Sequence, residues 1–200
     1  MADENRLLHV TATIAAEAPD LKSLPVVFTG GPGTGKTHLL QAIGNFAAMR
    51  HQGARVFHTS AEHFQAELVR AIKRGKLRRF MAWLSACDVF LLDDAHLLVG
   101  EGRPPEAALR VIEAVSKTRL VVATTRHPVK DPANWHPSLL RHLPDYGGVL
   151  TLDRPGEGLR RAVLEKKATL AGVSLPEDIS IHLAKRAYRN LHFLVEDFSK

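Results

Sequence analysis

Cysteine is almost absent from this chain of 200 residues, and other features are missing with it. The single cysteine, Cys87, excludes an internal disulfide framework and leaves a zinc site without its usual thiolates. No apolar run approaches the roughly 18 residues that a membrane span needs. The segment from Met1 to Arg6 leads into a polar, broken pattern, which differs from a signal peptide. We therefore expect a cytoplasmic protein that has no membrane partner.

Aromatic residues are also scarce, at 6% of the chain, whereas basic residues are in excess. The chain holds 27 lysines and arginines against 21 aspartates and glutamates, which gives a formal net charge of +6. A positive net charge favours an anionic partner, and nucleic acid is the obvious candidate. The scarcity of aromatic residues leaves few side chains for stacking against bases.

Short apolar runs alternate with helical patterns over the first three quarters of the chain. The apolar runs predict five strands, at residues 25–29, 54–58, 88–93, 119–124 and 148–152. Apolar periodicity between them predicts helices at residues 37–50, 61–74, 77–84 and 105–116. Continuous apolar strands separated by helices indicate a parallel sheet covered on both faces. The predicted fold class is therefore α/β with three layers.

The pattern becomes purely helical after Pro155, with helices predicted at residues 159–171, 177–188 and from 191 onward. This change predicts two parts, an α/β domain over residues 1–155 and a small helical domain over residues 156–200. The sequence leaves open whether the natural chain continues beyond Lys200.

A phosphate-binding motif lies between the first strand and the first helix. Residues 30–37 match the pattern G-x-x-x-x-G-K-[ST] in the strand-to-helix context that this P-loop requires. Its backbone N–H groups and the helix N-terminus bind phosphates, while Lys36 contacts the β- and γ-phosphates and Thr37 binds Mg²⁺. The predicted nucleotide contacts are Gly31, Gly33, Thr34, Gly35, Lys36, Thr37 and His38.

Two carboxylates, Asp93 and Asp94, end the most apolar strand. A carboxylate at the end of a buried strand is costly unless a cation or hydrogen bonds compensate it. We therefore predict that Asp93 holds Mg²⁺ and that Asp94 polarises an attacking water. The alternative is that both carboxylates cap the next helix.

Two threonines, Thr124 and Thr125, end the fourth predicted strand. In a P-loop fold with one strand inserted between the two motif strands, this end faces the γ-phosphate. A polar residue there positions water, so we include Thr125 in the catalytic set. The alternative is an ordinary strand end, because β-branched residues favour strands.

A dense basic run follows the second predicted helix, made of Arg70, Lys73, Arg74, Lys76, Arg78 and Arg79. A site that tracks a nucleic-acid backbone needs several such cations. The aromatic residues near this run, Phe64 and Phe80, are spaced as core residues, and we expect Trp83 to pack in the core or at a hinge. The alternative for the basic run is a solvated helix face.

The run from Gly35 to Asn45 (GKTHLLQAIGN) resembles the replication initiator DnaA and its relatives within the AAA+ ATPases. Further segments resemble the family's helical insertion, acidic motif, sensor 1 and lid, at residues 61–80, 88–98, 124–128, and 175–178 with 189–190. The resemblance implies a P-loop AAA+ domain with a C-terminal helical lid that binds ATP or ADP with Mg²⁺ in the bacterial cytoplasm.

The resemblance also implies partners. The family's insertion lines a channel for single-stranded DNA, which assigns DNA contacts to Lys73, Arg74 and Lys76, and Arg103 falls on a DNA-contacting arginine of the family. Replication proteins such as DnaA, the helicase or the clamp are the other implied partners.

Three positions depart from the family pattern. Thr125 stands where sensor 1 is usually acidic or an amide, Leu143 aligns with the arginine finger, and His192 falls on the sensor 2 arginine. Near Leu143, only Arg141 could substitute for the finger, after a local shift. An arginine finger is worth about 10³ to 10⁵ in rate. These departures imply weak self-assembly and at most a slow ATPase, as in a divergent paralogue or regulator of the DnaA family that is comparable with the Hda-like regulators.

Three functions follow from these observations. The first is a DnaA-like nucleotide switch that acts in replication initiation or its regulation. The second is an active helicase loader of the DnaC or IstB kind, which steady ATP turnover would distinguish from the first. The third is an interaction scaffold insensitive to nucleotide, in which the P-loop survives only structurally.

Overall fold

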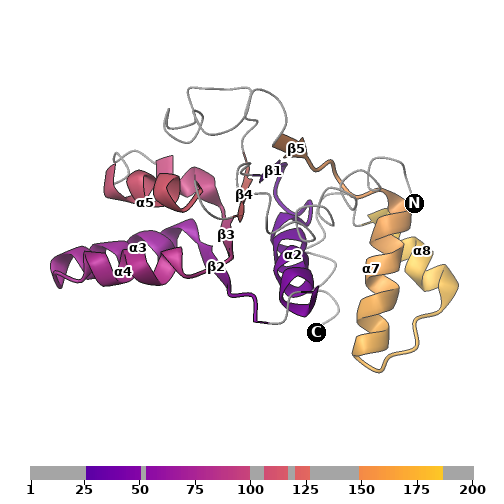
Figure 1. Cartoon of the computed structure of the whole chain (residues 1–200). Helices are drawn as coiled ribbons and strands as arrows, with labels where there is room; N and C mark the ends of the chain where they lie inside the picture. Colours follow the sequence, from indigo (N-terminus) through magenta and orange to yellow (C-terminus); the bar gives the residue numbers. More distant parts are fainter. Residues whose placement is uncertain (1–25, 51–52, 100–105, 117–119, 127–148, 187–200) are drawn as a thin grey trace.

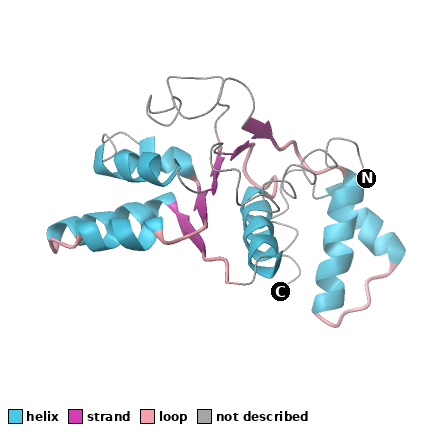
Figure 2. Ribbon diagram, viewed as in Figure 1, coloured by secondary structure: helices cyan, strands magenta, loops and turns pink. Residues whose placement is uncertain are grey.

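The computed structural model describes residues 26–50, 53–99, 106–116, 120–126 and 149–186. Within these ranges a parallel sheet stands between two helical layers, with a further pair of helices beside one of them (Figure 1). The separation of strands from helices into layers is also visible in Figure 2. The α/β fold class predicted from the sequence is confirmed.

The sheet has five strands: β1 (Val26–Thr29), β2 (Val56–Ser60), β3 (Val89–Asp93), β4 (Leu120–Thr125) and β5 (Val149–Thr151). Their order is β2-β3-β4-β1-β5, and every neighbouring pair is parallel. The strand β4 therefore lies between β1, which precedes the P-loop, and β3, which ends in the carboxylates. The carboxyl ends of all three strands meet at one edge of the sheet, as the sequence predicted.

Six α-helices and one 3₁₀ helix are described: α2 (Lys36–Arg50), α3 (Ala61–Lys73), α4 (Leu77–Ser85), η1 (Ala95–Val99), α5 (Glu106–Ser116), α7 (Glu157–Leu170) and α8 (Glu177–Arg186). The α-helices begin and end within two residues of the predicted bounds, whereas η1 was not predicted. The helix predicted from residue 191 onward lies outside the described residues. In the described part of the chain, no helix is both long and apolar enough to cross a membrane.

The strand β2 begins two residues later than the sequence predicted, because its bounds follow its neighbour β3. Arg55 instead makes two bonds with Asp88 before the ladder begins: its carbonyl accepts from the Asp88 N–H at 2.8 Å, and its own N–H donates to Asp88 Oδ2 at 2.9 Å. At the other end, Ser60 pairs with Asp93, and the Ser60 hydroxyl accepts from the His63 N–H at 3.2 Å to cap α3.

Two apolar clusters fill the two faces of the sheet. The cluster between the sheet and α3, α4 and α5 includes the fully buried Phe64, Leu84 and Phe90. The cluster between the sheet and α2 includes Phe28 and Leu40. Burying one such side chain contributes about 1.5–3 kcal/mol, so these two layers hold the edge that carries the P-loop and the carboxylates.

The helices α7 and α8 pack against each other around a small apolar cluster of their own, centred on Leu164 and Ala184. Arg160 joins them, since its Nε donates to the Ala184 carbonyl at 2.6 Å. Arg161 reaches Glu165 at 2.7 Å and Glu177 at 2.8 Å. The hydrogen bond from Arg161 is the main cause that lowers the pKa of the Glu165 carboxyl.

Candidate nucleotide-binding site

The loop between β1 and α2 has the backbone conformation of a phosphate cradle. Gly33 and Gly35 have φ values of 71° and 95°, in the left-handed region that side chains disfavour. The Thr34 hydroxyl donates to the Gly31 carbonyl at 3.0 Å and holds the turn. The Leu39 N–H donates to the Gly35 carbonyl at 2.9 Å, which starts the α2 hydrogen-bond ladder at the end of the loop.

The first glycine of the loop, Gly30, lies close to the backbone of both Thr125 and Leu152. The Gly30 N–H donates to the Thr125 carbonyl at 3.2 Å, and a Cβ placed on Gly30 would lie 2.5 Å from the Leu152 carbonyl oxygen. Only glycine fits there without moving backbone. At the next residue, Gly31, a Cβ would meet no atom within 4 Å, so the space beside the loop is open.

Lys36, the first residue of α2, turns its ammonium back into the loop. Its Nζ donates to the Gly30 carbonyl at 2.9 Å and to the Gly31 carbonyl at 2.7 Å, and the residue is only 7% exposed. Burial is the main cause that lowers the pKa of Lys36, while the charges of Asp94 and then Asp93 act in the opposite direction. The carboxylates of Asp93 and Asp94 are therefore close enough to Lys36 for their charges to act on its ammonium group.

A hydrogen-bonded chain fixes the carboxylate of Asp93 at the end of β3. The Thr124 hydroxyl donates to Asp93 Oδ1. That hydroxyl in turn accepts from the Asp94 N–H at 2.9 Å, and the same N–H lies 3.1 Å from Asp93 Oδ1. Both Asp93 and Thr124 are buried. These hydrogen bonds compensate the cost of burying the Asp93 carboxylate and orient it.

Asp94 adopts an unusual backbone conformation beside this chain. Its φ is 52°, the only positive value for a non-glycine residue among those described. Its carboxylate Oδ1 lies 3.6 Å from Arg126 Nε and 3.8 Å from His96 Nδ1. A left-handed aspartate costs on the order of 1 kcal/mol, and such strain clusters at functional sites. Arg126 was not singled out from the sequence, although it lies within the segment 124–128 that resembles sensor 1 of the family.

Comparison with known proteins supplies the family. A model of the bacterial DnaA ATPase domain matches residues 1–133 of this chain. The chain belongs to the bacterial DnaA ATPase domain family. The resemblance to DnaA that we derived from the sequence is therefore confirmed.

Individual DnaA proteins agree with this assignment. DnaA of Geobacter metallireducens is 31% identical over 192 residues, which are 95% of this chain and 42% of that protein. Domain III of Thermotoga maritima DnaA has a TM-score of 0.81 at 25% identity, covering 96% of this chain and 81% of that chain. A DnaA bound to AMPPCP and single-stranded DNA has a TM-score of 0.79 at 26% identity. The match covers 100% of this chain and 61% of that DnaA chain. The chain thus spans less than half the length of the full-length DnaA it matches.

Several other predicted nucleotide contacts of this DnaA-family domain lie in or beside the same loop. Thr37 and His38 lie in the first turn of α2 and are exposed, whereas Thr34 is buried. Thr125 is fully buried at the end of β4, in register with Thr29 of β1. His192 and Leu143 lie outside the described residues. The roles assigned to these residues stay predictions.

The residues present fit a nucleoside triphosphate with Mg²⁺. The glycine conformations, the open space at Gly31 and the buried ammonium of Lys36 suit a chain of phosphates. The Thr37 hydroxyl and the Asp93 carboxylate are the oxygen donors that Mg²⁺ prefers. Among the described residues, no group of three or more histidines, cysteines, aspartates or glutamates forms a separate metal site.

The predicted DNA-contacting residues lie away from the P-loop, at the turn between α3 and α4. Lys73, Arg74 and Lys76 are exposed there. Arg74 and Lys76 line one side of a hollow of about 250 Å³. Arg103 lies outside the described residues.

Of the two placements predicted for Trp83, in the core or at a hinge, the core is wrong, because the side chain is 52% exposed. The apolar periodicity of α4 selects Phe80 and Leu84, and Leu84 is fully buried. Trp83 precedes Leu84 on the helix and therefore faces a different side, which is only partly covered by the core. Cys87, which precedes β3, is buried.

Proposed function

We propose that this domain is a nucleotide-dependent switch that binds ATP and ADP with Mg²⁺ and acts in DNA replication initiation or its regulation. The observation that carries the proposal is the buried Lys36 ammonium, held against the loop carbonyls in the field of Asp93 and Asp94. The DnaA structure with bound AMPPCP, at 26% identity, supports a nucleotide as the ligand.

Each residue of the loop has a separate task in this proposal. Lys36 exchanges its bonds to the two loop carbonyls for bonds to the β- and γ-phosphates. The N–H groups of residues 31–38 bind phosphate oxygens at the positive end of α2. Thr37 and Asp93 hold Mg²⁺, which neutralises phosphate charge when it is bound. His192 is a further proposed contact to the nucleotide.

Hydrolysis is at most slow in this proposal. Asp94 is the group that polarises the attacking water, and Thr125 helps to position that water. The ion pair between Asp94 and Arg126 competes with this task, because it holds the carboxylate toward a cation. Leu143, at the position of the family's arginine finger, supplies no charge to the transition state.

The proposed macromolecular partners are single-stranded DNA and replication proteins such as DnaA, the helicase or the clamp. The net charge of +6 and the exposed Lys73, Arg74 and Lys76 support an anionic strand as one partner, together with Arg103. The DnaA structure with bound single-stranded DNA is consistent with this assignment. Residues 156–200 form the proposed helical lid, supported by the separate cluster of α7 and α8.

A titration with fluorescent ATP and ADP tests the proposal. The wild-type chain binds both nucleotides at micromolar concentration or below, and Lys36→Ala loses at least about tenfold in affinity because a charge-assisted phosphate contact is removed. Lys166→Ala is the matched control, since Lys166 is exposed on α7. It should leave the affinity unchanged.

Two results would contradict the switch. If the wild type does not bind nucleotide, or if wild type and Lys36→Ala bind it equally, the nucleotide-insensitive scaffold becomes the favoured function. Phosphate release under the same conditions separates the remaining functions, because steady turnover would favour an active loader-type ATPase.

A further inference from the structure

Three neighbouring hollows surround one exposed tryptophan on the face of the molecule that carries α3 and α4. Their volumes are about 330, 250 and 200 Å³, and Trp83 lines all three. Phe57 lines the first and third, and Phe80 the first and second. We call the surface made by Phe57, Phe80, Trp83, Arg74, Lys76 and Arg79 the Trp83 surface.

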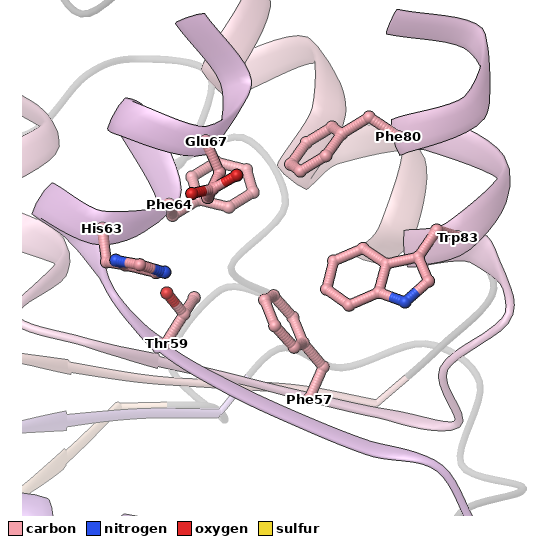
Figure 3. Close-up of a pocket in the computed structure, with 7 residues that line it drawn as sticks. All are labelled: Phe57, Thr59, His63, Phe64, Glu67, Phe80 and Trp83. Carbon is pink, nitrogen blue, oxygen red and sulfur yellow. The ribbon is translucent and has the colours of Figure 1, made fainter. Parts of the chain in front are cut away.

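The largest hollow is an aromatic pocket between the two helices, with the strand β2 beneath it. Figure 3 shows Phe57 rising from β2, Phe64 and Glu67 facing in from α3, and Phe80 and Trp83 facing in from α4. Phe64 is fully buried and forms the floor, whereas Trp83 is half exposed at the mouth. An apolar pocket with a large exposed aromatic at its rim is typical of a binding site.

The neighbouring hollow is basic. Arg74, Lys76 and Arg79 line it, and it shares Phe80 and Trp83 with the aromatic pocket. Within the described residues, no carboxylate forms an ion pair with any of these three cations. The one carboxylate in the hollow belongs to Glu67, which is paired with Arg70. The rim therefore has positive charge that a ligand can neutralise.

We propose that the Trp83 surface binds an acidic peptide segment of a partner protein. One large apolar side chain of the segment enters the aromatic pocket, and neighbouring carboxylates pair with Arg74, Lys76 and Arg79. Tryptophan and arginine are the residues most enriched at the energetic centres of protein interfaces. This site is separate from the P-loop and goes beyond the function proposed above. It shares Arg74 and Lys76 with the proposed DNA contacts, so the peptide and a DNA strand would compete for these two cations.

The ring arrangement favours a peptide side chain over a nucleic-acid base. Phe57 stacks on Phe90, with centroids 5.6 Å apart and planes at 18°, and meets the edge of Trp83 at 4.5 Å and 73°. Phe64 and Phe80 are tilted by 42° at 6.1 Å. Base platforms stack bases on open, parallel ring faces. Rings that already pack at such angles instead receive an aliphatic or aromatic side chain.

Two further observations define the ligand. Thr59 and Glu67 line the pocket with oxygen acceptors, which suit the backbone N–H groups of a peptide. A second copy of this chain does not fit the charge, because its net charge is +6 and two identical basic rims repel each other. The partner segment must supply negative charge together with an apolar anchor.

A display library of random twelve-residue peptides, selected on the full 200-residue chain without nucleotide, tests this proposal. Enriched peptides should share aspartates or glutamates around one aromatic residue or leucine. The affinity of a labelled enriched peptide is then measured by fluorescence anisotropy. Trp83→Ala should weaken binding by about 30-fold, as for an interface hot spot. Arg79→Glu should weaken binding by about fivefold or more, and less so at high salt.

Matched controls lie on α2, away from the Trp83 surface. Met49→Ala removes a side chain that is 80% exposed, and Arg50→Glu reverses an exposed charge. Both should bind the peptide within about twofold of wild type. If Trp83→Ala fails to fold, Arg79→Glu still decides the outcome, because Arg79 is exposed and its replacement leaves the core intact.

Four outcomes would overturn the proposal. These are no enriched peptide, peptides without acidic residues, binding that neither Trp83→Ala nor Arg79→Glu weakens, or a dimer of the chain that Trp83→Ala dissolves. Binding of a twelve-nucleotide oligothymidylate that displaces the peptide and is lost in Trp83→Ala would instead assign the pocket to bases. Since the selection contains no nucleotide, its failure leaves the nucleotide switch untouched.

Discussion

The carboxyl edge of the sheet and the Trp83 surface depart from ordinary burial in opposite ways. At the sheet edge, polar groups are buried: the side chains of Lys36, Asp93 and Thr124 are at most 8% exposed. At the Trp83 surface, an indole ring is half exposed, above a fully buried Phe64. Both arrangements are costly in a protein that has no ligand.

The two regions differ in whether other protein groups compensate this unfavourable exposure or burial. The buried polar groups satisfy one another, through the Lys36 bonds to loop carbonyls and the chain from Thr124 to Asp93. The exposed indole and its basic rim have no such compensation within the described residues. Changes at the sheet edge should therefore affect both folding and ligand binding, whereas changes to the exposed Trp83 and its basic rim should affect ligand binding far more than folding.

The largest effect is expected from the floor of the aromatic pocket. Phe64→Ala should lower the free energy of unfolding by about 3–5 kcal/mol, because it removes a fully buried ring and leaves a cavity. Trp83→Ala, the matched change at the mouth, should cost about 1 kcal/mol or less. Urea denaturation measures both. Equal losses would show that Trp83 is a core residue, and the Trp83 surface would then lack the exposed aromatic side chain that distinguishes it from the sheet edge.

The next effect concerns the hydroxyl that holds Asp93. Thr124→Val keeps the shape of the side chain but removes its donor and acceptor, so it should lower the free energy of unfolding by about 1–3 kcal/mol. Thr169→Val is the control, because the Thr169 hydroxyl bonds the Glu165 carbonyl on an exposed helix face. If Thr124→Val were as mild as its control, the chain of bonds would contribute little to holding the carboxylate.

Nucleotide affinity should depend on pH through Lys36. Phosphate binding needs the protonated ammonium, so affinity should fall about tenfold per pH unit above the pKa of Lys36 in the free protein. Because burial lowers that pKa, the fall should begin below the ordinary lysine value of 10.5. Titrations with fluorescent ATP between about pH 7 and about pH 10 measure it. Lys36→Arg, whose guanidinium stays charged, should show no such fall, and a flat wild-type profile would contradict the expectation.

The smallest effect is expected far from both regions, at the ion pairs between α7 and α8. Arg161→Ala should leave the stability unchanged within error, because solvent screens exposed pairs. It should, however, return the lowered pKa of the Glu165 carboxyl to its ordinary range. A carboxyl titration followed by NMR measures this change. A clear loss of stability would show that these pairs hold the helix pair together.

The sequence predicted the elements that local patterns define. Strands with continuous apolar runs, such as Val89–Asp93, and the P-loop with its helix lie within one residue of prediction. The meeting of Lys36 with the carboxylates was also predictable, because the order of strands in a P-loop fold brings their carboxyl ends together. Family resemblance added the fold and the class of ligand.

The remaining features depend on tertiary contacts that no local pattern records. The late start of β2 follows from its ladder with β3, and the positive φ of Asp94 from bonding across to Thr124. The exposure of Trp83 depends on how α4 is rotated over β2, which the hydrophobicity of a tryptophan alone does not predict. Although aromatic residues are scarce in the sequence, the fold gathers four phenyl rings and this indole at one place.

The two glycines that open the P-loop carry different evolutionary information. Gly30 is required by the fold itself, because any Cβ would strike the Leu152 carbonyl. Gly31 is not required in this way, since a side chain there would meet no protein atom within 4 Å. Purifying selection at position 30 therefore reports on folding, whereas selection at position 31 reports on whatever lies against the loop. A lineage that lost its nucleotide would keep the first glycine and let the second drift.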